Sequence, residues 1–255
     1  MQFLKLAKKY LIDSQIYVSA MGTFLAAFFM LEQNNFRLPT LLLIFITYFS
    51  GYLYTKFQNN KKIFFKIIVF NFLCGIICIF LIFKNHNEIR LVKWAVIVIL
   101  GLLYNSFFLE KFIRKIPLLK IFYIGLIWAL INSWLIFPGL NLNIFLISWL
   151  FVSALVLPFD IRDMNDDSII TFPKLIGIPK TKYLAYLMIF SALMFAVFYL
   201  KTEFSVAFFI SIIITFALIY YSENSNRDSY FSFWIECCSG FPLLFVMFLK
   251  ILDIG

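Results

Sequence analysis

Long apolar stretches divide the chain, and short polar connections separate them. Apolar residues run on without alternation through segments such as 41–54 and 183–200. A transmembrane β-strand alternates apolar and polar residues over about ten positions. These longer runs instead predict helices, which satisfy their own backbone groups in lipid. We predict nine membrane-spanning helices, over residues 15–31, 39–56, 64–83, 92–109, 118–137, 143–159, 183–200, 204–221 and 231–250.

The composition excludes a soluble globular domain. Apolar residues make up 63% of the 255 residues and charged residues 14%, where about 25% charged is usual in a soluble domain. So few charges cannot cover the outside of a compact fold of this size. The longest polar connection is 160–182, and no soluble segment stands apart. We therefore expect residues 1–255 to form a single all-α integral membrane domain.

The basic residues are divided unequally between the two sides that nine spans create. Sixteen of the 22 lysine and arginine residues fall on the side of the amino terminus and six on the other side. Basic residues gather in cytoplasmic loops, so we expect a cytoplasmic amino terminus and an outer carboxyl terminus in a bacterial inner membrane. This bias accounts for the net charge of +9. We expect membrane lipids as partners and no nucleic acid, because no aromatic-basic motif of an RNA or DNA binder is present.

An acidic cluster follows the sixth predicted span, with four of the 13 acidic residues inside positions 160–167. Asp160, Asp163 and Asp167 are three and four residues apart, so on a helix they would share one face. Like charges at this spacing repel unless a cation neutralises them, and Mg²⁺ prefers carboxylate oxygens, water and phosphate oxygens. We interpret these three as Mg²⁺ ligands, with Arg162 and Asp166 as secondary members. An inert, solvated acidic loop is the alternative.

The cluster and the residues after it resemble a known motif. The segment Asp160–Asp167, then Thr171-Phe172-Pro173 and Gly177, follows the sixth of nine predicted helices. In sequence and position it resembles the second aspartate-rich motif of the UbiA superfamily of intramembrane prenyltransferases. Weaker similarity lies in Leu103–Ser106 and in the basic loop 111–120. The resemblance in topology extends over nearly the whole chain.

This resemblance implies a UbiA-like bundle with a cavity open to the cytoplasmic side. It also implies transfer of an isoprenyl group, an alkyl group other than methyl, from an isoprenyl diphosphate to an acceptor. Mg²⁺ and basic residues would stabilise the leaving diphosphate, with Asp163 and Asp167 taking part in catalysis. Aromatic faces would line the path of the allylic cation. The candidate diphosphate contacts are Lys111, Arg114, Lys115, Lys174 and Lys180.

The first aspartate-rich motif of the superfamily is absent. The corresponding stretch, Ser50–Lys62, contains no acidic residue, and its polar side chains include Asn59, Asn60 and three lysines. A protonated lysine cannot ligate a metal, so a two-metal site is not expected. Three interpretations stay open. They are a divergent prenyltransferase with one metal and basic residues, a non-catalytic protein that binds an isoprenoid or another lipid, and a transporter-type protein with an unrelated acidic loop.

One acidic residue, Glu236, lies within the last predicted span, close to its cytoplasmic end. A carboxyl group within a span is costly and is a candidate functional residue. We predict either a catalytic role, as a base or charge partner beneath the Asp160 cluster, or a side chain that snorkels to the membrane surface or pairs with Arg227. The sequence does not indicate the acceptor, the prenyl chain length or the oligomeric state.

Overall fold

The computed structural model describes residues 15–84, 87–105, 116, 118–165 and 169–252. Within these ranges every regular element is a helix, as the unbroken apolar runs predict. The elements are α2 Ile16–Glu32, α3 Leu38–Phe57, α4 Lys61–Lys84, α5 Glu88–Asn105, α6 Leu119–Leu130, the π-helix η2 Ile131–Leu135, α7 Leu142–Arg162, α8 Phe172–Ile176, α9 Ile178–Tyr199, α10 Thr202–Tyr220, the π-helix η3 Tyr230–Ile235 and α11 Phe241–Ile251.

Each of the nine predicted ranges lies mostly on helix in the part of the chain that the structure describes, but a turn at residues 238–240 interrupts the last one, 231–250. The η2 segment continues α6, and η3 precedes α11. Five helices in these ranges, α3, α4, α7, α9 and α10, are long and apolar enough to cross a membrane. The α2, α6–η2 and α11 segments are apolar but shorter. The all-α fold is therefore confirmed, whereas a crossing by all nine helices stays a prediction.

The outer faces of the bundle are apolar. α4, α9 and α10 expose large apolar side chains in their central turns, among them Phe72, Phe190 and Phe209. In water, a contiguous surface of this kind marks a site of association or aggregation. In a bilayer it meets acyl chains that are equally apolar. These helices therefore form part of the surface that lipid covers.

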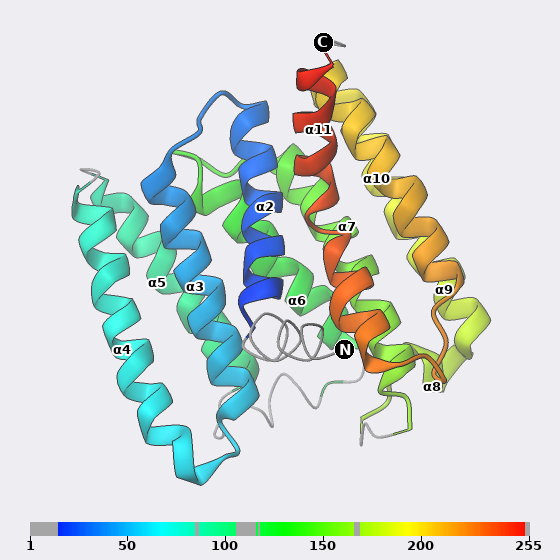
Figure 1. The fold of residues 1–255 in the computed structure, drawn as a ribbon, viewed down its shortest axis with the longest axis horizontal. Helices are drawn as coiled ribbons and strands as arrows, with labels where there is room; N and C mark the ends of the chain where they lie inside the picture. Colours follow the sequence, from blue (N-terminus) through cyan, green and yellow to red (C-terminus); the bar gives the residue numbers. More distant parts are fainter. Residues whose placement is uncertain (1–14, 85–86, 106–115, 117, 166–168, 253–255) are drawn as a thin grey trace.

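α7 is the most buried of the five candidate spans, and it packs between α6 and α9 (Figure 1). Its close approach to α6 depends on Gly125, where an added Cβ would lie 2.1 Å from Ser153 Oγ. Across the same interface, Asn132 Nδ2 donates to Ser148 Oγ at 2.7 Å. Small residues and interhelical hydrogen bonds hold helices together in lipid, where apolar burial alone favours no protein neighbour. This packing fixes where the carboxyl-terminal end of α7 lies.

The two ends of the bundle carry different numbers of basic residues. We call one of them the motif end; there α3 and α7 end and α6 and α9 begin (Figure 1). The opposite end joins α2 to α3, α4 to α5, η2 to α7 and α9 to α10. It carries the smaller basic set that the alternation of spans predicts, namely Arg37, Lys84, Arg90, Lys93, Lys201 and Lys250. Which side of a membrane each end faces stays a prediction.

At the end opposite the motif end, two buried cations bind carbonyl groups in the last turn of η2 and just after it. Lys93 Nζ donates to three backbone carbonyls within residues 134–138, the shortest contact being 2.7 Å. Arg90 donates to Thr40 Oγ1 at 2.8 Å and to the Ile136 carbonyl at 3.3 Å. The carbonyl end of a helix carries partial negative charge. It therefore stabilises both cations inside the bundle.

We expect Lys93→Met to lower the thermal midpoint of the detergent-purified protein. Three carbonyls lose a charged donor, and a hydrogen bond to a charged group contributes about 1.5–3 kcal/mol. Lys201→Met at the exposed start of α10 is the control, with an expected midpoint near that of the wild type. Thermal unfolding followed by a thiol-reactive dye measures both. Equal midpoints for the two variants would contradict the stabilising role of Lys93.

Candidate functional site

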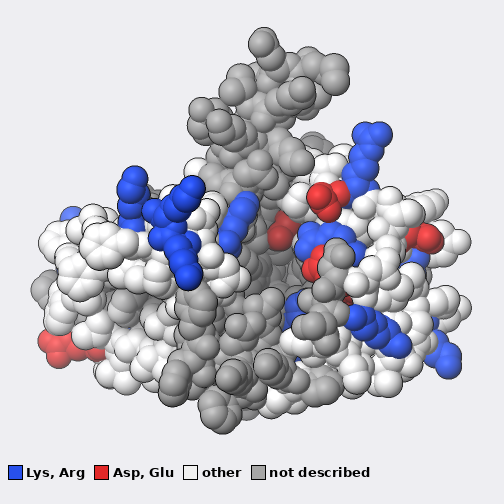
Figure 2. Space-filling model, turned by 90° about the horizontal axis from the view of Figure 1, so that it is seen from below, with Lys and Arg blue, Asp and Glu red and all other residues white. Residues whose placement is uncertain are grey.

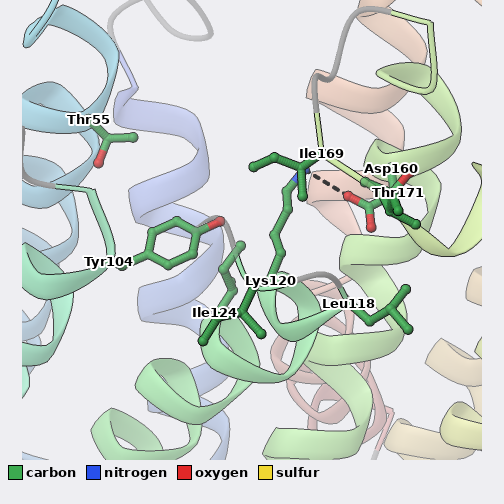
Figure 3. Close-up of a pocket in the computed structure, with 10 residues that line it drawn as sticks. Thr55, Tyr104, Leu118, Lys120, Ile124, Asp160, Ile169 and Thr171 are labelled. Atoms are coloured by element: carbon green, nitrogen blue, oxygen red, sulfur yellow. Dashed lines mark ion pairs between the residues drawn. The ribbon is translucent and has the colours of Figure 1, made fainter. Parts of the chain in front are cut away.

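A cavity of about 230 Å³ lies at the motif end, between α3, α5, α6 and α7 (Figure 3). Half of its lining is apolar and consists of four isoleucines and one leucine. Its polar side chains are Thr55 from α3, Tyr104 from α5, Lys120 from α6, Asp160 from α7, and Thr171 at the start of α8. A polar head group beside an apolar chain fits such a lining.

Asp160 is the buried acid of the motif, with a side chain only 2% exposed, and Lys120 Nζ lies 2.7 Å from its Oδ1. A lone carboxylate in an apolar interior costs several kcal/mol, which a cation at this distance offsets. Lys120 comes from the first turn of α6, and Figure 3 shows its side chain reaching across to Asp160. The ion pair therefore joins α6 to the end of α7 at the cavity wall.

Asp163 has a different basic partner, Arg162. The guanidinium binds the Asp163 carboxylate through two contacts, Nε to Oδ1 at 2.6 Å and Nη2 to Oδ2 at 2.9 Å. It also lies over the rings of Phe159 and Phe231, at 5.3 and 5.8 Å from their centroids. Aromatic faces attract a cation at this range. These contacts hold Arg162 and Asp163 together at the end of α7.

The connection between α10 and η3 fixes the end of α7. Asn224 Nδ2 donates to the carbonyls of Ile161 at 3.0 Å and of Arg162 at 2.8 Å, and Asn165 Nδ2 donates to Asn224 Oδ1 at 3.2 Å. These bonds satisfy carbonyls that a helix leaves unpaired at its end. α7 therefore ends at Arg162. The helical face expected across residues 160–167 does not continue through the described residues 163–165, which form a turn.

The described carboxylates do not by themselves fit a metal centre. Asp160 and Asp163 each have a basic partner, so two negative charges are already balanced by two positive ones. Across the described ranges, no three His, Cys, Asp or Glu side chains are grouped in a way that could hold a metal ion. Asp166 and Asp167 lie outside those ranges. Magnesium binding by Asp160, Asp163 and Asp167 therefore stays a prediction.

The predicted diphosphate contacts that the structure describes do not line the cavity. Lys174 on α8 and Lys180 on α9 are exposed and do not line the cavity. Lys111, Arg114 and Lys115 lie outside the described residues. Figure 2 views the motif end and shows basic side chains over the side formed by α3 and α4, with acidic and basic side chains together on the opposite side.

Glu236 follows η3 and is partly buried. It lies within electrostatic reach of Arg162 and of Tyr52. No ion pair joins it to Arg227, although the structure describes both residues. A catalytic role for Glu236 stays a prediction.

No place in the cavity was predicted for Lys120, the partner of Asp160, or for Thr171, which was named only as part of the motif. A signal for Lys120 exists, because it lies inside the predicted span 118–137 and a charge within a span needs a partner. The position of Thr171 depends on tertiary packing, since the adjacent Phe172 packs edge-on against Phe122 of α6, 6.3 Å between centroids. No local pattern in the sequence indicates that contact.

Comparison with known proteins bears on the fold. The chain is similar to a solved structure described as digeranylgeranylglyceryl phosphate synthase in membranes, with a TM-score of 0.60 and 17% sequence identity. The similarity covers 97% of this chain and 98% of that chain. That protein is a prenyltransferase of the UbiA superfamily, so the UbiA-like helical fold is confirmed, whereas nine membrane spans and a cavity open to the cytoplasmic side stay predictions. No protein-family model matches the sequence, and no curated protein matches it.

We expect Asn224→Ala to loosen the end of α7, because two helix carbonyls lose their donor at about 1 kcal/mol each. Hydrogen exchange should become faster in residues 158–163, with a lower thermal midpoint. Asn226→Ala is the matched control, since the Asn226 side chain donates to the Tyr221 carbonyl within its own connection. Unchanged exchange in Asn224→Ala would contradict its role in ending the helix.

Proposed function

We propose that this chain is a membrane prenyltransferase of the UbiA type, which moves an isoprenyl group from an isoprenyl diphosphate to an acceptor. One observation carries the proposal. In a bundle with the fold of a membrane prenyltransferase, the buried Asp160 pairs with the partly exposed Lys120 in the wall of a cavity whose lining residues are half apolar. Such a cavity suits a substrate with a strongly charged head and an apolar chain.

In the proposed reaction, the bond between the first isoprenyl carbon and the diphosphate oxygen breaks, and its electron pair leaves with the diphosphate. The allylic cation is then captured by a nucleophile of the acceptor, which gives up a proton. Lys120 supplies positive charge where the leaving group develops negative charge. Tyr104 lines the cavity and stacks on Tyr123, 5.4 Å between centroids. Its aromatic face suits the neighbourhood of the cation.

Other residues of the motif end have supporting roles in this proposal. Arg162 holds Asp163 and lies within electrostatic reach of Glu236. Glu236 is the proposed acceptor of the released proton, and its place within electrostatic reach of Arg162 supports this role. Magnesium dependence through Asp163 and Asp167 stays a prediction. The assay that tests transfer also tests it.

A second candidate function is binding of an isoprenoid phosphate without turnover. A specific observation favours it: both described aspartates of the motif are neutralised by basic side chains. In addition, α3 ends in Lys56 and Phe57 and is followed by Asn59 and Asn60, where the superfamily has its first aspartate motif. A cavity with this charge balance can hold an anionic head group without supplying the full charge needed for cleavage.

We expect the purified protein to release diphosphate from isoprenyl diphosphates of at least one chain length, and to do so faster with Mg²⁺ than with a chelator. Asp163→Asn and Asp167→Asn should each lower the rate by about 10²-fold, the loss typical when one electrostatic element of an active site is removed. Glu203→Gln, at the opposite end of the bundle, is the control with an unchanged rate.

Release that is insensitive to Mg²⁺ and to both aspartate variants would contradict this enzymatic role for the motif. Saturable binding without turnover, tested with several classes of acceptor, would instead favour the second candidate. Mass spectrometry of the prenylated product, alongside diphosphate release, distinguishes transfer to an acceptor from simple hydrolysis.

A further inference from the structure

We propose that Lys120 and Thr171 form a phosphate-binding subsite, and that Asp160 is the counter-ion that positions Lys120 rather than a metal ligand. The inference deepens the proposed function and rests on it. It assigns the head group of the isoprenoid phosphate to two named side chains and makes its binding independent of metal.

The Thr171 hydroxyl is the first observation. Thr171 is 3% exposed and lines the cavity, yet its Oγ1 has no hydrogen-bond partner among the described residues. Thr171 is also the N-cap residue of α8, but its side chain makes no capping bond to that helix. Buried polar groups in folded proteins are nearly always paired. An orphaned hydroxyl in a cavity wall therefore indicates a polar atom of a ligand.

The position of Lys120 is the second observation. Its ammonium group has three donors, so it can bind Asp160 and an anion in the cavity at the same time. Asp160 is almost fully buried and lies 2.7 Å from the Lys120 Nζ, which fixes the ammonium at the wall. Figure 3 shows Lys120, Asp160 and Thr171 at the same side of the cavity. Lys120 and Thr171 thus form a pair of hydrogen-bond donors, and Asp160 is the buried counter-ion of Lys120.

The charge balance of the cavity favours an anion over a metal ion beside Lys120 and Thr171. A metal bound to Asp160 would have to displace the lysine from the carboxylate. A phosphoryl oxygen gains the positive charge of Lys120 and a hydrogen bond from Thr171, while the ion pair stays in place. The neighbouring Leu118 and Ile124 offer apolar contact to the first carbons of an isoprenyl chain.

The size of the cavity agrees with a head-group site. Its volume of about 230 Å³ is below the 300–1,000 Å³ typical of sites that enclose a whole drug-sized ligand. A phosphate group and the adjoining carbons fill such a space, and the rest of the isoprenyl chain lies outside it. The subsite therefore selects for the charged head of the lipid rather than for the length of its chain.

The test is the binding of farnesyl thiodiphosphate, a poorly cleaved probe, to the detergent-purified full chain with EDTA, measured by calorimetry. The wild-type protein should bind without metal. Thr171→Val should weaken binding by about tenfold or more, the range for a hydrogen bond to a charged group, and Thr171→Ser should restore it. Thr215→Val is the control, because its hydroxyl already donates to the Ser211 carbonyl at 2.8 Å in α10.

Asp160→Asn separates the two roles of the carboxylate. As a counter-ion, its removal leaves Lys120 charged, so metal-free binding should be equal or tighter. As a metal ligand, its removal would abolish binding that requires Mg²⁺. Lys120→Met is made together with Asp160→Asn, because a lone buried carboxylate would destabilise the fold. This double variant should lose at least tenfold in affinity relative to Asp160→Asn alone while keeping the wild-type elution volume in size-exclusion chromatography.

Three results would overturn the inference: binding only with Mg²⁺ and lost in Asp160→Asn, equal affinity in wild type and Thr171→Val, or no binding of the probe under any condition. Turnover measured on the same preparations keeps the two proposals apart. Metal-free binding with the predicted variant pattern but no product would support the subsite and remove the transferase. Product formation together with binding that requires both Mg²⁺ and Asp160 would support the transferase and remove the subsite.

Discussion

A carboxylate inside an apolar bundle needs a positive partner, and the ion pair between Asp160 and Lys120 meets that requirement. Its consequences extend beyond the pair. It ties the start of α6 to the end of α7 and places one positive and one negative charge in the wall of an otherwise largely apolar cavity. The same requirement is met differently at the opposite end, where Arg90 and Lys93 are buried against backbone carbonyls. At both ends of the bundle, a group of opposite charge or a set of backbone carbonyls therefore stabilises the buried charges.

The two described aspartates of the motif contact different parts of the molecule. Asp160 lines the cavity together with Lys120, whereas Asp163 is bound to Arg162, which lies over Phe159 and Phe231. The amide of Asn224 caps the carbonyls between them. One short segment therefore connects the cavity to the α10–η3 side of the molecule, where Glu236 lies. Because of this connection, Glu236 has a role in the proposed chemistry although it is distant from the motif in sequence.

Much of the fold could be predicted from the sequence, because the apolar runs are long and the connections short. The differences lie at polar helix ends. The predicted span 183–200 begins late, since α9 starts at Ile178 with Pro179 in its first turn, a position that suits proline but has no apolar signal. The site was less predictable. Lys120 and Asp160 are 40 positions apart, and the cap that ends α7 comes from Asn224, 62 residues beyond Arg162. Such partners depend on tertiary packing, which no local pattern encodes.

The central claim is that the cavity at the motif end holds the head group of an isoprenoid phosphate. A structure determined by electron cryomicroscopy with bound farnesyl thiodiphosphate tests it most directly. The account predicts phosphorus density beside Lys120 and Thr171, with the isoprenyl chain leaving past Ile124. Density for the head group at another place in the bundle, or an Asp160 carboxylate turned from Lys120 onto a metal ion, would contradict it.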